Sequence, residues 1–144
     1  MPNQSFLEID ETRLDEEWVD QPVLFYSYAV NLANARRVLD QDKAYLEETK
    51  ASLSLEIRDD PEHYGLVKIT ESSIEAVMTS MIQSERTRVR NAKHEVDILA
   101  AAVSALDHRK CALENLVTLH SQNCFSTSQS TKDPIRASME QDDD

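Results

Sequence analysis

The feature that most constrains this chain is its scarcity of helix-breaking residues. Its 144 residues include one glycine, Gly65, and four prolines, whereas globular domains average about 7 % glycine. Strands need a turn every few residues, and turns draw heavily on glycine and proline. The segments 23–58 and 72–120 contain neither residue. We therefore expect a single all-α domain built from long helices.

Apolar residues recur every seven positions in the first of these segments. The row consists of Phe25, Leu32, Leu39, Leu46 and Leu53. It predicts an amphipathic helix whose first half is the more deeply buried, since Asp42 and Glu56 interrupt a second row farther along. Asp20 or Gln21 can cap this helix, with Pro22 in its first turn, where the missing N–H costs nothing.

A turn is expected over residues 59–70. Pro61 disfavours helix at Asp60, and Gly65 supplies a permissive backbone. Ser72 and Glu75 then form a capping-box pattern, which predicts the start of the next helix.

The second helix carries a coiled-coil pattern, with valine at one heptad position and mostly leucine three residues later. Its two rows are Val89, Val96, Val103 and Val117, and Ala92, Leu99, Leu106 and Leu113. Lys110 takes the remaining place in the first row, where a buried lysine is expected to set register or oligomeric state. Residues 74–82 fit the pattern less well, so a bend near residues 83–88 would be accommodated.

Two long helices joined by a turn form an antiparallel helical hairpin with coiled-coil packing, which we assign to residues 21–120. Each helix of such a hairpin faces one neighbour only, so its core is thin and its apolar rows need partner chains. We therefore expect a homo-oligomer. Residues 1–20 are acidic and expected to be mostly disordered, and residues 121–144 are expected to form a disordered polar and acidic tail.

The formal net charge of −12 is concentrated at the two ends of the chain. The acidic tail could compete within the molecule for a basic surface or dock on a basic partner, but a role in solubility is the favoured interpretation. Cys111 and Cys124 are too few and too unpatterned to form a disulfide framework. No apolar run reaches the roughly 18 residues that a membrane span needs, and the acidic N-terminus does not resemble a signal peptide. We expect a soluble, cytoplasmic protein with no membrane association.

Residues 59–65 hold the densest group of acid–base side chains. Asp59, Asp60, Glu62 and His63 could bind a cation. However, calcium loops need a longer ligand run, and the zinc-ligand spacings are absent. A solvated turn is the favoured interpretation. No nucleophile stands in a pattern with a base and an orienting group, so we expect no catalytic residue, no metal site, no cofactor and no enzymatic activity.

The segment "ERTRVRNAKH" forms the strongest positive cluster in the chain. Arg86, Arg90 and Lys93 stand at i, i+4 and i+7 and so share one helix face, with Arg88 beside them. Such a stripe can track a phosphate backbone. It can also be the solvated flank of a coiled coil, with salt bridges to a partner helix, and the residues alone favour this second interpretation. Both stay open at this point.

The chain resembles the UvsY-type recombination mediators of tailed bacteriophages over residues 22–125. The first half, "VLFYSYAVNLANARRVLDQDKAYLEETKASLSLEIRDDPEHYG", shares an aromatic start to a long helix and the position of the turn. The second half, "KITESSIEAVMTSM" and "HEVDILAAAVSALDHRKCALENLVTLHSQNCF", is similar to the later helical region. The family has a Lys-x-Arg pair before its turn; Arg58 matches this pair, whereas Glu56 does not.

The resemblance implies a helical protein that assembles into rings and binds single-stranded DNA. It would help to load a recombinase onto DNA coated by single-strand-binding protein during phage recombination, repair and replication, in the host cytoplasm. The implied DNA-binding residues are Arg58, Arg86, Arg88, Arg90 and Lys93. The alternative is a non-catalytic coiled-coil structural or adaptor protein without DNA binding.

Overall fold

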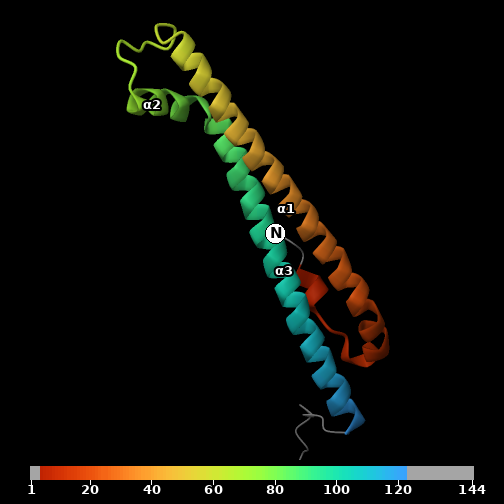
Figure 1. The fold of residues 1–144 in the computed structure, drawn as a ribbon. Coiled ribbons are helices and arrows are strands. Elements are labelled where there is room, and N and C mark those ends of the chain that lie inside the picture. Colours follow the sequence, from red (N-terminus) through yellow and green to blue (C-terminus); the bar gives the residue numbers. More distant parts are fainter. Residues whose placement is uncertain (1–3, 123–144) are drawn as a thin grey trace, which may run out of the picture.

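A computed structural model describes residues 4–122, which are mostly helical and contain no strand. The elements are the 3-10 turns η1 (Gln4–Leu7) and η2 (Glu11–Arg13) and the helices α1 (Leu14–Asp59), α2 (Glu71–Met81) and α3 (Gln83–Ser121). α1 and α3 lie side by side and run in opposite directions (Figure 1). The prediction of an all-helical protein, with one long helix packed against another, is thus confirmed. The predicted tail lies outside the described residues from residue 123 onward.

The core is a narrow seam between α1 and α3. Leu32 and Leu39 of α1 are buried, and Leu106 and Leu113 of α3 are fully enclosed. Burying one such side chain stabilises the fold by about 1.5–3 kcal/mol relative to leaving it in water. Within residues 4–122, no helix is long and apolar enough to span a bilayer.

The seam departs from its predicted row at the N-terminal end of α1. Gln21 is buried there, and its side-chain amide donates a hydrogen bond of 2.8 Å to the backbone carbonyl of Leu106. Leu24 follows Gln21 at helical spacing and is less exposed than its neighbour Phe25. Phe25 was expected in the seam, but it is 36 % exposed because the seam has shifted by one residue at this level.

Residues 4–7 and 11–20 are helical, in a segment that we expected to be mostly disordered. Asp10 caps η2 by accepting a hydrogen bond of 2.9 Å from the backbone N–H of Thr12. The ring of Phe6 stacks on that of Tyr28, with centroids 4.8 Å apart. These contacts attach the N-terminal segment to the side of α1.

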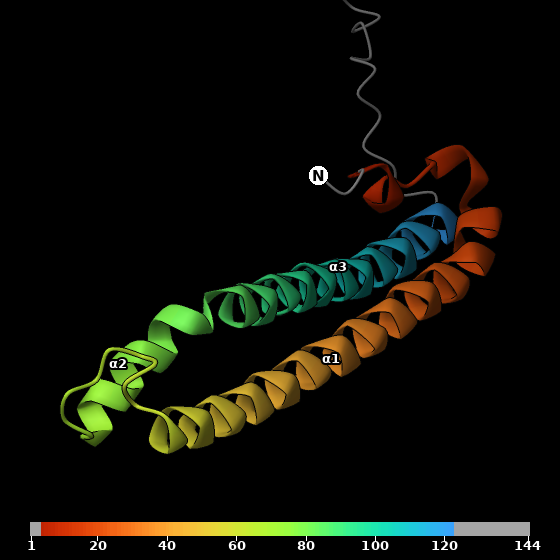
Figure 2. The ribbon, with the colours of Figure 1, turned by 90° about the horizontal axis from the view of Figure 1, so that it is seen from above.

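The first long helix also starts earlier than predicted. α1 begins at Leu14 rather than near Asp20, so Pro22 lies inside the helix instead of in its first turn. The three acids in the first turn of α1 interact favourably with the positive end of the helix dipole. Pro22 lacks the N–H that a helix interior uses, and its ring crowds the preceding turn. Figure 2 shows the first turns of α1 bending away from the axis of the rest, as expected around a proline.

A buried arginine connects the N-terminal elements to α3. Arg109 is 7 % exposed. Its guanidinium donates hydrogen bonds to the side-chain oxygen of Gln21 at 2.5 Å and to the backbone carbonyl of Glu8 at 3.0 Å, and it forms an ion pair with Glu17. Its Nε has no hydrogen-bond partner among the described residues. This arginine therefore joins the link between η1 and η2, α1 and α3 at one point.

The prediction that Lys110 enters the seam is wrong. Lys110 is exposed, and its Nζ lies 3.8 Å from the Glu114 carboxylate on the same helix. The buried residues of α3 are Ala102, Leu106, Arg109 and Leu113. Leu106 and Leu113 belong to the predicted leucine row, whereas Ala102 and Arg109 lie one residue before positions 103 and 110 of the predicted valine row. Arg109 rather than Lys110 therefore lies against α1.

The two long helices are joined by a loop of residues 60–70 and by α2. Gly65 adopts a φ of 71° in this loop, a conformation that residues with a Cβ rarely take. The backbone N–H groups of Tyr64 and Leu66 both donate to the carbonyl of Pro61, at 3.2 and 3.0 Å. The loop thus closes on itself through backbone hydrogen bonds.

α2 starts at a different cap from the one predicted. Thr70 Oγ1 accepts the backbone N–H of Ser73 at 3.2 Å, and Ser73 Oγ accepts the backbone N–H of Thr70 at 3.0 Å. This reciprocal pair is the capping box, so Ser72 and Glu75 do not form it.

The second helical segment is divided at Ile82, between α2 and α3. The division comes one residue before the segment where a bend was expected. Ile82 is 1 % exposed and, like Ile57 of α1 and Ile74 of α2, is enclosed at this end of the hairpin. Ile74 and Ile82 line one cavity, and the burial of all three isoleucines holds α2 at the end of the long helices.

Candidate nucleic-acid interface

The register of the two long helices is fixed by polar contacts at two levels. Gln21 of α1 contacts Arg109 of α3, and Asp42 of α1 forms an ion pair of 2.5 Å with Arg88. The separation from Gln21 to Asp42 equals that from Arg88 to Arg109. The helices therefore remain in one antiparallel register between these contacts.

This register gathers basic residues from both helices on one side. We define the basic flank as Arg36, Lys43 and Lys50 of α1 with Arg86, Arg90 and Lys93 of α3. The three members on α1 recur every seven residues, and each follows a seam residue by one position. Arg86 and Lys93 take the equivalent position on α3. In an antiparallel pair, equivalent positions of the two helices meet on the same side of the seam.

A shared cavity supports this placement directly. Lys50 of α1 and Arg86 of α3 line the same cavity of about 250 Å³, together with Ser54, Glu71, Ile74, Glu75, Met78, Thr79 and Ile82. Two cationic groups from different helices therefore border one space. Glu71 and Glu75 add negative charge at its α2 side.

The cations of the basic flank differ in how far their charge is already compensated. On α1, Lys50 lies 2.6 Å from Glu47 and Lys43 lies 4.0 Å from Asp40. The acidic partners are largely exposed, so these are weak surface pairs of about 0–1 kcal/mol. On α3, Arg86, Arg90 and Lys93 form no ion pair within residues 4–122. The α3 side therefore presents the more available positive charge.

An acid also borders this side of α3. The hydroxyl of Ser84 lies 2.7 Å from the Glu85 carboxylate, and this hydrogen bond holds the pKa of that carboxyl below its usual value. Glu85 consequently carries a negative charge next to Arg86 at neutral pH. The basic flank is thus a mixed surface in which cations predominate.

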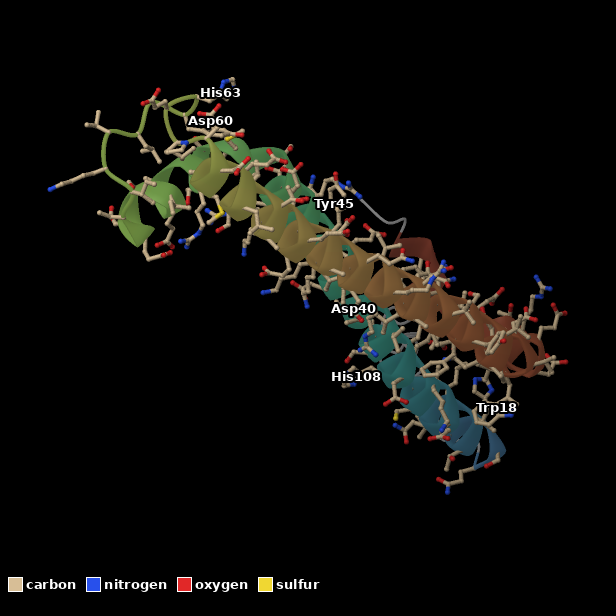
Figure 3. The ribbon with its side chains drawn as sticks, turned by 45° about the horizontal axis from the view of Figure 1, so that its top comes forward. Trp18, Asp40, Tyr45, Asp60, His63 and His108 are labelled. Atoms are coloured by element: carbon tan, nitrogen blue, oxygen red, sulfur yellow. The ribbon has the colours of Figure 1, made fainter. Side chains whose placement is uncertain are left out.

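Arg88 lies on the opposite side of the seam from the basic flank. Its guanidinium pairs with Asp42 and sits over the ring of Tyr45, 5.3 Å from the centroid. Figure 3 shows Tyr45 on one side of α1 and Asp40, the partner of Lys43, on the other. Two residues along a helix rotate a side chain by about 200°, which separates Arg88 from Arg86 and Arg90. Arg88 joins the two helices instead of extending the basic flank.

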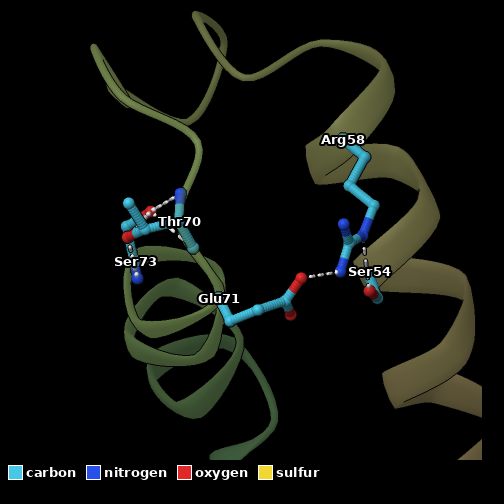
Figure 4. A network of polar contacts seen from close by, with 5 residues as sticks. All are labelled: Ser54, Arg58, Thr70, Glu71 and Ser73. Carbon is cyan, nitrogen blue, oxygen red and sulfur yellow. Dashed lines mark hydrogen bonds and ion pairs between the residues drawn. The ribbon is translucent and has the colours of Figure 1, made fainter.

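Arg58 is likewise engaged within the molecule. Its guanidinium lies 2.6 Å from the Glu71 carboxylate of α2, and its Nε lies 3.5 Å from the hydroxyl of Ser54 (Figure 4). The pair attaches the first turn of α2 to the last turn of α1. The structure therefore brings together Arg86, Arg90 and Lys93 from the five predicted residues, and it places Arg58 and Arg88 in separate intramolecular contacts.

The acid-rich turn makes local contacts. The Asp60 carboxylate accepts the backbone N–H of His63 at 3.2 Å, and Glu56 accepts the hydroxyl of Tyr64 at 3.3 Å. Loss of hydration, together with the Glu56 carboxylate beside it, raises the pKa of the Tyr64 hydroxyl. Within residues 4–122, no group of three or more His, Cys, Asp or Glu residues is arranged to hold a metal ion.

Sequence reasoning missed Arg36, Lys43 and Lys50 as candidates. They recur at one heptad position of α1, and that periodicity was the available signal. It could be connected with Arg86 and Lys93 only once the antiparallel register was known. Comparison with known proteins adds no further guide, since no protein-family description, curated protein or solved structure matches the chain. The resemblance to the UvsY-type mediators thus stays a prediction.

Proposed function

We propose that this chain is a non-enzymatic recombination mediator that binds single-stranded DNA along the basic flank and helps to load a recombinase onto it. The observation that carries the proposal is the convergence of cations from α1 and α3 on one side of the hairpin. Lys50 and Arg86 border one cavity there. Like charges on facing helix positions repel, and a bound polyanion removes that repulsion.

A rod-shaped basic flank suits a flexible phosphate backbone. The members of the flank are spaced at about one per helical turn on α3, so successive cations can contact successive phosphates. Binding of this kind is independent of base sequence, because phosphates carry no sequence information. It weakens steeply with salt, since each neutralised phosphate releases condensed counterions.

Two further parts of the proposal come from the sequence. Action together with a recombinase and a single-strand-binding protein rests on the resemblance. Self-association into a homo-oligomer is expected from the thin core of the hairpin, and the resemblance describes the oligomer as a ring. Repetition of the basic flank in an oligomer would combine weak individual contacts by multivalency, so that modest affinity per subunit suffices.

The second candidate function is a structural or adaptor protein without DNA binding. Two observations favour it: Arg58 and Arg88 are used in intramolecular ion pairs, and Asp40 and Glu47 stand among the cations of the flank. In that case the basic flank contributes only to solubility and register. The two candidates differ in one measurable property, which is affinity for nucleic acid.

A fluorescence anisotropy titration with labelled oligo-dT at low salt tests the proposal. The unmodified protein should bind. A plot of log affinity against log salt concentration should have a slope of about −0.7 for each phosphate that the protein neutralises. Reversal of Arg86, Arg90 and Lys93 to Glu should abolish this binding while the helical circular-dichroism signal is retained.

A second triple variant provides the matched control. Reversal of Arg13, Lys68 and Lys110 to Glu changes the net charge equally, but these residues lie off the basic flank. This variant should bind within about threefold of the unmodified protein, because screened charges beyond about 10 Å contribute little. Equal losses in both variants, or no binding of oligo-dT up to high micromolar protein, would rule out the flank as a DNA-binding surface.

A further inference from the structure

In the N-terminal half of α1, apolar side chains also lie on sides of the helix that α3 does not contact. Residues 21–35 contain no charged side chain. A helix that is apolar around its circumference is normally buried on every side. Here α3 covers one side only, and several large apolar side chains remain exposed.

The exposed residues are ordered along the helix. Glu16, Val19, Val23, Tyr26, Val30, Ala33 and Arg37 follow one another at alternating steps of three and four residues. We call this set the outer seam. Val19, Val23 and Tyr26 are each about 70 % exposed, and Val30 is 38 % exposed. Steps of three and four are the spacing of a coiled-coil contact surface.

The outer seam lies away from both intramolecular contacts of this part of α1. With about 100° of rotation per residue, it stands roughly half a turn around the helix from Gln21 and Leu32, which face α3. The N-terminal segment contacts α1 at the edge of the side that faces α3, where Phe6 stacks on Tyr28, one heptad after Gln21. Neighbouring elements border the outer seam, since Val23 lines a cavity with Phe6 and Tyr26 lines one with Lys110. Both side chains nevertheless stay about 70 % exposed, so no element among the described residues covers them.

The order of residues in the outer seam is self-complementary. Residues at equal distances before and after Tyr26 match one another. Val23 corresponds to Val30, and Val19 corresponds to Ala33. At the two ends, the acid Glu16 corresponds to the base Arg37. Two copies laid antiparallel, with a two-fold axis at Tyr26, would therefore place opposite charges at both ends and apolar side chains between them.

We infer that the outer seam is a self-association surface, on which α1 of a second copy packs antiparallel to the first. The overlap of residues 16–37 spans about 33 Å at 1.5 Å per residue. A helix from an unrelated protein would need the same palindromic order of charges, and a second copy supplies it by symmetry. Helix dipoles also favour the antiparallel arrangement, since opposite ends meet.

This inference gives a surface to the self-association in the proposed function, but it does not depend on DNA binding. The outer seam and the basic flank share no residue. A contact that is symmetric about a two-fold axis closes at two copies, so the structure assigns a dimer, or an even-numbered assembly built from dimers, to this surface. A larger ring requires a second contact elsewhere.

The first test is an apolar-to-charged change measured in the absence of DNA. Val23→Asp should raise the dimer dissociation constant about a hundredfold or more in sedimentation equilibrium, because two valines are lost per dimer. Leu55→Asp is the matched control, since Leu55 is equally exposed on α1 but lies beyond the outer seam. Its dissociation constant should stay within about twofold. Equal effects of the two changes would overturn the inference.

The second test exploits the symmetry of the charges. Glu16→Arg alone and Arg37→Glu alone should each weaken the dimer about tenfold, because each places like charges opposite one another twice per dimer. The double variant should restore association to within about threefold. A chain that stays monomeric at all concentrations, as it would if its own C-terminal residues or another protein covered the seam, contradicts the inference. So does a double variant that is no tighter than the singles.

Discussion

At the scale of single residues, the largest departure from sequence reasoning is the exchange of roles between Arg109 and Lys110. Heptad counting assigned Lys110 to the seam, yet Arg109 is buried and Lys110 is exposed. A guanidinium can satisfy several acceptors at once, and Arg109 contacts Gln21, Glu17 and the Glu8 carbonyl. Counting could not anticipate a shift of one residue that these acceptors impose.

Arg109→Met should therefore cost about 3 kcal/mol of unfolding free energy, since it leaves buried acceptors without their donor. Lys110→Met should stay within about 0.5 kcal/mol, as for an exposed side chain with a weak i,i+4 pair. Urea denaturation of the two variants measures both values. Similar costs for the two changes would show that Arg109 does not hold the N-terminal elements.

Glu17 makes this contact depend on acidity. A hydrogen bond from the backbone N–H of Asp10, followed by the contact with Arg109, lowers the pKa of the Glu17 carboxyl from its usual 4.5. A lowered folded-state pKa means that the stabilisation is complete above about pH 4.5 and is lost as pH falls through the folded-state value. Unfolding free energies between neutral and acid pH should fall less steeply for Glu17→Gln than for the unmodified chain. Parallel curves would contradict this role.

At the scale of elements, the sequence predicts that the long helices form, but it does not predict the residues at which they begin and end. Leucines at every seventh position, together with the absence of glycine and proline, predict these helices correctly because both signals extend over many turns. The ends depend on single hydrogen bonds. Leu14 starts α1 although Pro22 looked like a first-turn proline, and Thr70 caps α2 although Ser72 also fitted the pattern.

The cap gives an element-scale prediction. Thr70→Ala should destabilise the protein by about 1 kcal/mol, because Thr70 supplies the side-chain acceptor at the start of α2. Ser72→Ala tests the cap expected from sequence and should change the free energy by less than about 0.5 kcal/mol. Thermal or urea unfolding of both variants decides between the two assignments. A larger loss for Ser72→Ala would contradict the observed capping box.

The sequence predicts part of the candidate site correctly. Arg86, Arg90 and Lys93 share a helix face, and spacing alone placed them together. Arg88 and Arg58 were grouped with them by nearness in sequence or by resemblance, but they bind Asp42 and Glu71. Only the packed structure shows which acids lie across the seam, since those partners are far apart along the chain.

At the scale of the whole molecule, the hairpin is long and thin, and the two surfaces proposed for binding, the basic flank and the outer seam, are separate. The basic flank runs along both long helices, whereas the outer seam follows the N-terminal half of α1. This separation means that assembly and nucleic-acid binding can be altered independently. Val23→Asp should weaken assembly without removing the charges of the flank, and reversal of the flank should leave the sequence of the outer seam intact.

The most direct test of the central claim is whether α1 and α3 act as one DNA-binding surface. In the oligo-dT titration at low salt, Lys50→Glu on α1 and Arg86→Glu on α3 should each weaken binding about tenfold, because the two cations border one cavity. Lys110→Glu, with the same change in charge away from the flank, should weaken it less than about twofold. No binding by the unmodified protein, or a Lys50→Glu variant that binds as well as Lys110→Glu, would contradict the account.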